Sequence, residues 1–251
     1  MKILEITGSP RPEKSSRTAL AADAFVAGMK GEGTAAANAD SEAAEVRRFN
    51  IYSKEIADCI SCYGCWRKPR QGCMVSDDFQ EFYEDLFWAE RIVWSFPLYW
   101  FGMPAGDKAA LDRLFCLLLP HIYMDGDVCK HPQSRQLPPI TFVVTCGYPR
   151  TENNIDAVRL QLCSAPALGC PALFCVPEAG YLTVPGFEQY AEPLMAKIKT
   201  AGGEFAATGR LKKETEAQLS EQWLPEDLFL ETHNGWANKI AGPEIDSDIR
   251  L

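Results

Sequence analysis

Short apolar runs recur along most of the chain, and each is followed by a segment with apolar residues at helical spacing. The apolar runs cover residues 2–7, 91–96, 140–145 and 171–177, and residues 45–51 (EVRRFNI) are a plausible short second strand. Helical segments are predicted over residues 16–29, from residue 77, from residue 104, over 152–163 and over 187–199. Continuous apolar runs are typical of strands buried on both faces, as in a parallel sheet. The alternation therefore predicts an α/β fold, a doubly wound five-stranded parallel sheet with helices on both faces.

The last part of the chain differs from the rest. Residues 201–251 carry ten acidic and five basic side chains, and a helix start is predicted at residues 225–227. Small and polar residues over 31–44 and 121–138 predict surface connections. We therefore expect a main domain over residues 1–200, with a Cys-rich loop over 52–76, and a helical C-terminal extension over residues 201–251 that docks on it.

Composition narrows the class of function. The 251 residues include 25 Lys and Arg against 34 Asp and Glu, a net charge of −9, whereas a nucleic-acid-binding face needs surplus cations. No stretch approaches the roughly 20 apolar residues of a membrane span, and the first apolar run is too short for a secretory signal. We therefore expect a cytoplasmic protein with no nucleic-acid or membrane partner. There the ten cysteines are expected to be thiols, metal ligands or redox groups rather than a disulfide framework.

Candidate chemistry lies in the loops that follow strands, because an open parallel sheet binds its ligands beyond the carboxyl ends of the strands. The first such loop, GSPRPEKSS (8–16), opens a helix, and its candidate anion-binding residues are Ser9, Arg11, Ser15 and Ser16. Backbone N–H groups at a helix N-terminus attract phosphate, and hydroxyls and an arginine add donors. A simple turn that ends in an N-cap serine fits the same residues equally well.

Two more strand-ending loops carry residues suited to a flat ring. The loop PLYWFGMP (97–104) brings three consecutive aromatic residues and a glycine, namely Tyr99, Trp100, Phe101 and Gly102. Such a loop can line an aromatic ligand while its backbone amides bond the ligand's edge, although the rings could equally cap the core or an oligomer contact. The loop TCGYPR (145–150) places Thr145 and Gly147 at the same edge.

The Cys-rich loop has the sharpest spacing in the chain. Four cysteines follow the pattern C-x2-C-x2-C-x7-C, namely Cys59, Cys62, Cys65 and Cys73. Closely spaced thiolates of this kind suit an iron–sulfur cluster held by four cysteines. Zinc more often uses two separated C-x2-C pairs, and a metal-free loop with packing or redox thiols is a further alternative.

The remaining cysteines and the histidines give weaker signals. Four cysteines lie on apolar stretches and are predicted to be core residues, namely Cys116, Cys163, Cys170 and Cys175. The roles of Cys129 and Cys146 stay open. The three histidines are scattered without metal-ligand spacing, so solvated or locally bonded side chains are predicted.

In motif order the chain resembles the NADPH-dependent FMN reductase family of the flavodoxin-like superfamily, and within it the iron–sulfur flavoprotein branch. The resemblance rests on GSPRPEKSS, on the Cys-rich loop that leads into DDF, and on PLYWFGMPAGDKAALDR. It covers roughly residues 1–200, and the tail around LKKETEAQLSEQWLPEDLF is similar too. It implies a flavodoxin-like sheet with strand order 2-1-3-4-5 and one FMN per subunit.

The resemblance also assigns residues to cofactors. The FMN phosphate would be held by Ser9, Arg11, Ser15 and Ser16. The ring and ribityl parts would contact Pro97, Leu98, Tyr99, Trp100, Phe101 and Gly102 on one side and Thr145 and Gly147 on the other. A [4Fe–4S] cluster would be ligated by Cys59, Cys62, Cys65 and Cys73.

These cofactors imply an NAD(P)H-dependent flavin oxidoreductase that couples two-electron donors to one-electron acceptors, with the chemistry on the flavin and no catalytic side chain. Either NAD(P)H or a reduced ferredoxin is expected as the reductant, and the family resemblance implies a homo-oligomer, a dimer or a tetramer. Two alternatives stay open: an NAD(P)H-dependent FMN or quinone reductase without a cluster, and a non-enzymatic flavodoxin-like electron carrier.

Overall fold

The computed structural model describes residues 1–32, 44–68 and 71–241, so part of the predicted connection over 31–44 lies outside the described residues. Its centre is a five-stranded sheet in the order β2-β1-β3-β6-β7 with every pair parallel. The strands are β1 Lys2–Thr7, β2 Glu45–Asn50, β3 Arg91–Pro97, β6 Ile140–Thr145 and β7 Ala172–Val176. When only the five strands of this sheet are numbered along the chain, their order is 2-1-3-4-5. This order confirms the predicted flavodoxin-like topology.

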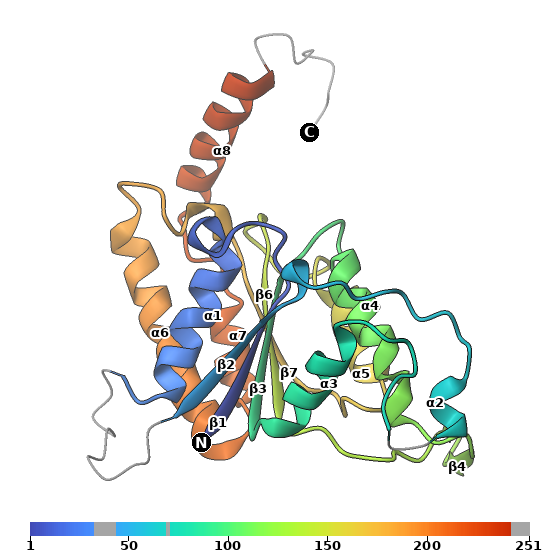
Figure 1. Cartoon of the computed structure of the whole chain (residues 1–251). Coiled ribbons are helices and arrows are strands. Elements are labelled where there is room, and N and C mark those ends of the chain that lie inside the picture. The colour runs from blue at the N-terminus through green and yellow to red at the C-terminus, as the bar shows by residue number, and fades with distance from the viewer. Residues whose placement is uncertain (33–43, 69–70, 242–251) are drawn as a thin grey trace.

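Helices cover both faces of the sheet (Figure 1). One face is covered by α1 and α6 and the other by α3, α4 and α5, with bounds α1 Arg17–Met29, α3 Phe79–Trp88, α4 Ala105–Arg113, α5 Asp156–Ser164 and α6 Glu188–Thr208. Alternate strand residues enter two separate cores, so that Phe142 and Val144 of β6 pack toward α3 and α5 while Val143 packs toward α1 and α6. The strands β1, β3, β6 and β7 are therefore buried on both faces, which explains their apolar runs, whereas the edge strand β2 is largely exposed.

Helix boundaries differ from the predictions where turns intervene. The helix predicted over 152–163 begins at Asp156, because residues 151–155 form turns: the N–H groups of Asn154 and Ile155 donate to the Thr151 carbonyl. Asn153 has a φ of 63° there, and its N–H donates to the Asp156 carboxylate. The helix predicted to end at residue 199 continues to Thr208 despite Pro193, so it crosses the boundary expected at residue 200.

A β-hairpin lies inside the segment 121–138 that was predicted to be a loop. It pairs β4 Tyr123–Asp125 with β5 Val128–Lys130 in antiparallel fashion. The two connecting residues are Gly126, which has a φ of 61°, and Asp127, and a two-residue Gly-Asp connection is a known hairpin signal. The prediction of an irregular loop was therefore wrong at these residues.

The C-terminal part is helical, as expected. The helix α7 Lys213–Leu219 continues the layer of α1 and α6, whereas α8 Glu226–Ala241 extends away from the sheet (Figure 1). The connection between them is tied to β7 through Glu178, whose carboxylate accepts hydrogen bonds from the N–H groups of Trp223 and Leu224 at 3.1 and 3.0 Å. No helix among the described residues is both long and apolar enough to cross a membrane.

The helices α1 and α6 approach so closely that only glycine fits at their crossing. A Cβ atom added to Gly28 would lie 1.7 Å from the Lys199 carbonyl oxygen, and one added to Gly202 would lie 1.9 Å from that of Phe25. Backbone atoms cannot move aside as flexible side chains can, so the two helices would have to separate.

Substitution Gly28→Ala is therefore expected to lower the free energy of unfolding by about 1–3 kcal/mol, the usual cost of overpacking. In a helix free of contacts the same change stabilises by up to about 1 kcal/mol. Gly235→Ala in α8, where nothing lies within 4 Å of the added Cβ, is the matched control. Urea unfolding of both variants tests the difference, and equal stabilities for the two would contradict the packing argument.

Below the end of β1 lies a buried carboxyl group without a counter-charge. The Asp107 side chain, in the first turn of α4, is fully buried against Gly8 and accepts a hydrogen bond from Trp94 Nε1 at 2.7 Å. Its other oxygen has no partner among the described residues. Burial disfavours the ionised form and raises the pKa of Asp107 to about 7.

Between about pH 4 and pH 7 the Asp107 carboxyl is protonated in the folded state but ionised in the unfolded state. The free energy of unfolding therefore falls as pH rises through this range. Asp107→Asn keeps an acceptor for Trp94 and cannot ionise. We expect the stability of the variant relative to the parent to increase from pH 4.5 to pH 8 by at most a few kcal/mol, since one pKa unit is about 1.4 kcal/mol.

Urea unfolding of both proteins at pH 4.5 and pH 8 measures this difference. Glu5, whose pKa burial also raises to about 7, is present in both proteins and cancels from the comparison. A stability difference between the two proteins that is the same at both pH values would show that Asp107 does not titrate in this range.

Candidate functional site

A cleft of about 570 Å³ opens at the carboxyl edge of the sheet. It is formed by the loops after β1, β3 and β6, by the start of α1, by the turn Ala179–Tyr181 after β7 and by one side of α8. Eight of the predicted cofactor-binding residues line it, namely Ser9, Arg11, Ser16, Pro97, Leu98, Tyr99, Thr145 and Gly147. Parallel pairing brings these loops together, because β1, β3 and β6 are neighbours that end at the same edge.

The N-terminus of α1 faces this cleft. Ser16 is its N-cap residue, and its Oγ accepts a hydrogen bond from the N–H of Ala19 at 3.1 Å. The first turn contains no acidic side chain, so no carboxylate competes for the positive end of the helix dipole. Arg17 lines the cleft there, and Arg11 adds a second cation from the preceding loop. The arrangement suits an anionic group such as a phosphate.

Hydrogen bonds lock the strand-ending loops to each other. The Leu98 N–H donates to the Thr145 carbonyl at 2.7 Å, and the Thr145 and Thr18 hydroxyls are 2.6 Å apart. The second of these bonds joins the end of β6 to the first turn of α1. The cleft is thus a fixed junction of three segments that lie far apart in the sequence.

Four predicted cofactor-binding residues lie outside the lining of the cleft. Ser15 is exposed, and its hydroxyl donates to the Pro12 carbonyl at 3.0 Å. Trp100 and Phe101 have φ values of 48° and 60° in a tight turn closed by two backbone hydrogen bonds between Tyr99 and Gly102. Trp100 is 94% exposed, and the Phe101 ring stacks on Tyr148.

Several cleft residues carried no signal in the sequence. Cys146 and Tyr181 come from the loops after β6 and β7, and Thr232, His233 and Trp236 come from α8. The Tyr181 hydroxyl lies 3.3 Å from His233 Nδ1, and the Tyr181 ring packs edge-on against Phe229. These two contacts anchor α8 at the cleft. The amphipathic pattern of the tail predicts a helix, but it does not indicate which ligand site that helix would cover.

The four cysteines of the Cys-rich loop meet in a second, smaller pocket, which we call the sulfur pocket. It is lined by Cys59, Cys62, Cys65, Cys73 and Cys116, together with Arg113, Phe115 and residues of the same loop. The four loop thiols are free, and two of them are exposed. Among the described residues no three His, Cys, Asp or Glu side chains are close enough to hold one metal ion together.

A buried ion pair fixes the wall of the sulfur pocket. Arg113, whose side chain is fully buried, forms an ion pair with Asp77 and lies 4.3 Å above the Phe79 ring. Its guanidinium donates to the carbonyl oxygens of Val75 and Ala57 at 3.1 and 3.3 Å. Val75 and Ala57 flank the cysteines on either side, so this one side chain ties both ends of the Cys-rich loop to α4.

Arg113 also brings positive charge to the sulfur. It lies within hydrogen-bonding reach of Cys73, and a cation favours a thiolate over a thiol. Burial has the opposite effect on Cys116 and raises the pKa of that thiol to about 12. Burial thus holds Cys116 as a thiol.

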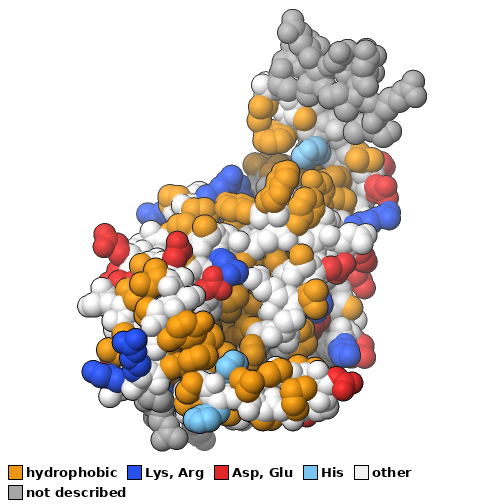
Figure 2. All heavy atoms as spheres, turned by 90° about the vertical axis from the view of Figure 1, so that its right-hand side faces the viewer, with side chains coloured by type: hydrophobic (Ala, Val, Ile, Leu, Met, Phe, Trp, Pro, Cys, Tyr) orange, Lys and Arg blue, Asp and Glu red, His pale blue; other side chains and the backbone are white. Residues whose placement is uncertain are grey.

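Aromatic rings enclose the pocket on its outer side. Trp66, from the short helix α2 Gly64–Arg67, packs 4.9 Å from Phe115 and from Tyr63, and 5.4 Å from the His131 ring. Apolar side chains gather over this side of the molecule (Figure 2). The exposed apolar residues of the Cys-rich loop and the hairpin are Ile60, Tyr63, Met74, Ile122, Tyr123, Met124 and Val128.

The other cysteines divide in a way that the sequence did not predict. Cys116 and Cys175 are buried, as expected. Cys163 and Cys170 are not core residues: they are half-buried and exposed, and a disulfide joins them across seven residues. The prediction of core thiols was wrong there because α5 ends at Ser164 and the chain turns back on itself, which brings Cys170 to the surface beside Cys163.

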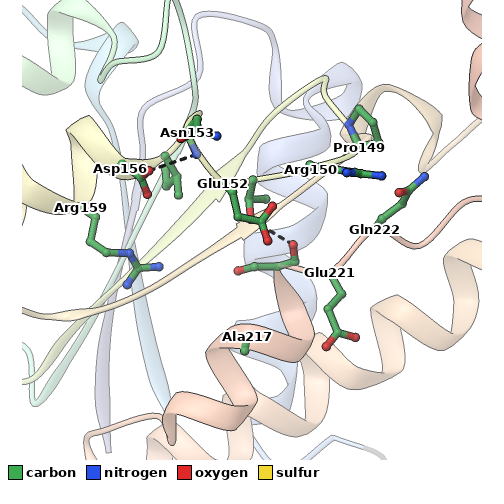
Figure 3. Close-up of a pocket in the computed structure, with 12 residues that line it drawn as sticks. Pro149, Arg150, Glu152, Asn153, Asp156, Arg159, Ala217, Glu221 and Gln222 are labelled. Atoms are coloured by element: carbon green, nitrogen blue, oxygen red, sulfur yellow. Dashed lines mark hydrogen bonds between the residues drawn. The ribbon is translucent and has the colours of Figure 1, made fainter. Parts of the chain in front are cut away.

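A further pocket of about 800 Å³ lies between the loop after β6, α5 and α7 (Figure 3). The Thr151 hydroxyl donates to the Ser220 carbonyl across it at 3.2 Å. Both of its arginines already face carboxylates, Arg150 at 3.3 Å from Glu226 and Arg159 at 3.5 Å from Glu216. Both arginines of this pocket are thus already paired with carboxylates beside it.

Comparisons with known proteins agree with this geometry. An iron–sulfur flavoprotein of Methanocaldococcus jannaschii is 32% identical over 118 residues, which are 47% of this chain and 52% of the relative. The alignment thus spans about half the length of that curated relative. Among solved structures, an NAD(P)H:quinone oxidoreductase from Methanothermobacter marburgensis superposes with a TM-score of 0.53 at 16% identity, over 82% of this chain and 96% of the other.

An FMN-dependent NADH-azoreductase from Bacillus anthracis, solved in complex with FMN, superposes with a TM-score of 0.52 at 13% identity over 82% of this chain and 99% of the other. At such identities the two structures support the fold alone. A family model with the description flavodoxin-like fold matches residues 1–117 of this chain. These residues contain β1, β2, β3, the Cys-rich loop and α4. Over these residues, which are just under half of the chain, the sequence is similar to that family.

Proposed function

We propose that the protein is an FMN-dependent oxidoreductase that couples an FMN in the cleft to a [4Fe–4S] cluster in the sulfur pocket. The observation that carries the proposal is the convergence of three strand-ending loops and the N-terminus of α1 on one cleft. Its volume of about 570 Å³ falls within the range of small-molecule sites. The flavoprotein relatives and the FMN-bound azoreductase structure point in the same direction.

The N-terminus of α1 is the part of the cleft that fits the FMN phosphate. Ser16 accepts the Ala19 N–H through Oγ, which leaves its hydroxyl hydrogen to donate to an anion. Ser9 is buried beside it, and Arg11 supplies a charge-assisted donor. The helix dipole and these donors act on the same group, so their contributions reinforce each other.

The loops after β3 and β6 fit the ring and the ribityl chain. Pro97, Leu98 and Tyr99 form one wall, and Thr145 and Gly147 form the other. Gly147 presents backbone without a side chain, which leaves room for a ring edge. A bound FMN supplies hydride acceptance and one-electron transfer. The protein holds the ring, orients it and limits water through Tyr181 and Trp236 at the cleft rim.

The sulfur pocket fits a cluster better than a single ion. A mononuclear zinc site requires its ligands to converge on one point, which the described thiols do not do. In a [4Fe–4S] cluster each cysteine binds a different iron, so Cys59, Cys62, Cys65 and Cys73 need only surround the cluster. Arg113 brings a buried positive charge that stabilises thiolate ligands.

The cleft and the sulfur pocket offer two routes by which a reductant could deliver electrons. The sequence offers no separate nucleotide-binding motif, so NAD(P)H would approach the flavin through the open side of the cleft. A reduced ferredoxin could deliver electrons through the sulfur pocket instead, because exposed apolar side chains near that pocket offer a contact surface for a protein partner. A cluster-free NAD(P)H-dependent quinone reductase is the second candidate, favoured by the named activity of the M. marburgensis structural neighbour.

Assembly and location complete the proposal. Trp100 stands 94% exposed beside the cleft, and α8 carries Leu230, Trp236 and Ile240 with about half or more of their surface exposed. Large exposed apolar groups of this kind are covered in oligomers, so we propose a homo-oligomer, a dimer or a tetramer. A thiol-rich loop stays reduced in the cytoplasm, which is the location proposed.

Removal of the Arg11 side chain is expected to weaken the binding of FMN but not that of riboflavin. Arg11→Ala should weaken FMN binding by about 10- to 100-fold, because hydrogen bonds to charged groups contribute about 1.5–3 kcal/mol. Binding of riboflavin, which lacks the phosphate, should be unchanged. Titration by quenching of flavin fluorescence measures both ligands, with Lys14→Ala, an exposed cation outside the cleft lining, as the control. Equal losses for FMN and riboflavin would remove Arg11 from the phosphate site, and no FMN uptake by the parent would refute the function.

The cluster is tested by the iron and acid-labile sulfide content of anaerobically purified protein. The parent is expected to hold about four irons per chain, and Cys62→Ser is expected to lose most of them. Cys129→Ser removes a free exposed thiol on the hairpin and should keep the full content. A parent protein that binds FMN but contains neither iron nor sulfide would favour the cluster-free reductase.

A further inference from the structure

Two buried thiols that the proposed function does not use lie side by side beneath the cleft. Cys175 belongs to β7, and Cys146 is the first residue after β6. The strands pair in parallel with Val144 opposite Cys175, and the Cys146 N–H donates to the Val176 carbonyl at 3.0 Å. Cys146 follows Val144 by two residues, so the two side chains point to the same face of the sheet. Cys146 is therefore a diagonal neighbour of Cys175 on that face.

The two side chains are in contact. Both belong to the core that packs toward α3, α4 and α5, with Cys175 fully buried and Cys146 5% exposed. The thiols lie within hydrogen-bonding reach of each other, and this bond lowers the pKa of Cys146 and raises that of Cys175. Cys146 is thus the sulfur of the pair that loses its proton more readily, and thiol–disulfide chemistry proceeds through the thiolate.

Cys146 connects this pair to the cleft. It lies between Thr145 and Gly147, the two residues of its loop assigned to the flavin, and it lines the cleft itself. Its Sγ is 3.5 Å from the Tyr148 carbonyl. Because Cys146 stands at the end of the strand rather than within it, the adjoining loop can adjust as the sulfurs approach bonding distance.

We propose that Cys146 and Cys175 form a reversible dithiol–disulfide pair that exchanges two electrons with the flavin in the cleft. In the oxidising direction two S–H bonds break and one S–S bond forms. The two electrons and one proton pass to the oxidised flavin, and the second proton passes to solvent. The pair adds a two-electron store to the site, and it rests on the proposed function because the flavin is its redox partner.

The other cysteines are placed for different tasks. The four loop thiols and Cys116 line the sulfur pocket, Cys129 lies on the exposed hairpin, and Cys163 and Cys170 are already bonded to each other. Among the described residues, Cys146 and Cys175 are thus the free thiol pair that adjoins the cleft. The surface disulfide provides the matched control, since it is also a pair that can be reduced.

The full-length protein is first reduced, and the reductant is then removed. Oxidised FMN is added under anaerobic conditions. Flavin absorbance follows its reduction, and alkylation followed by tryptic mapping follows the thiols. We expect partial to complete bleaching of one FMN per chain and a cross-link between peptide 136–150, which contains Cys146, and peptide 160–197, which contains Cys163, Cys170 and Cys175. Fragmentation of the cross-linked peptides assigns the bond to Cys175. Cys175→Ala should lose both signals, whereas Cys163→Ala should keep them.

Each outcome separates this proposal from the function on which it rests. FMN that binds, as judged by fluorescence quenching, but is not bleached would overturn the dithiol pair and leave the flavoprotein function standing. Bleaching that persists in Cys175→Ala and disappears in Cys163→Ala would assign the electrons to the surface pair and also overturn it. Absence of FMN binding would overturn both. Formation of the 136–150 and 160–197 cross-link by FMN, lost in Cys175→Ala, supports the pair directly.

Discussion

The parallel pairing of β1, β3 and β6 is the constraint on which the rest of the structure depends. Parallel neighbours end at the same edge, so three loops separated by dozens of residues must meet there. The helix that follows β1 then points its N-terminus at the junction, and the bond between Thr18 and Thr145 closes it. The cleft is therefore a consequence of strand order, and its polarity follows from which residues end the strands.

The sulfur pocket depends on a different interaction. Its loop begins beyond β2 and returns to α3, and the described residues of this loop are not part of the main sheet. Arg113 holds the loop instead, through its ion pair with Asp77 and its hydrogen bonds to the carbonyls of Ala57 and Val75. A buried guanidinium without these partners would be strongly unfavourable, so the same contacts that satisfy the arginine also fix the cysteines. The cleft and the pocket are thus held by separate parts of the fold.

Much of the architecture was predictable because it is encoded locally. Apolar runs indicated four strands of the main sheet, a short segment at 45–51 indicated the fifth, and the spacing of four cysteines indicated one shared pocket. Prediction failed where local signals were weak or were overridden. The Gly-Asp turn of the β4–β5 hairpin was interpreted as part of a loop, turns at residues 151–155 delayed the start of α5, and Cys163 and Cys170 came to the surface together instead of entering the core.

The sequence by itself determined the alternation of strands and helices, the strand-ending loops that carry chemistry and the ligand spacing of the cysteines, because periodicity and spacing are properties of neighbouring residues. Only the tertiary structure decided that α8 covers the cleft, that Ser15 and Trp100 turn away from it, that Arg113 ties down the Cys-rich loop, and that Cys146 meets Cys175. Each of these depends on contacts between residues far apart in the chain, whose geometry is fixed by packing and not by any local pattern.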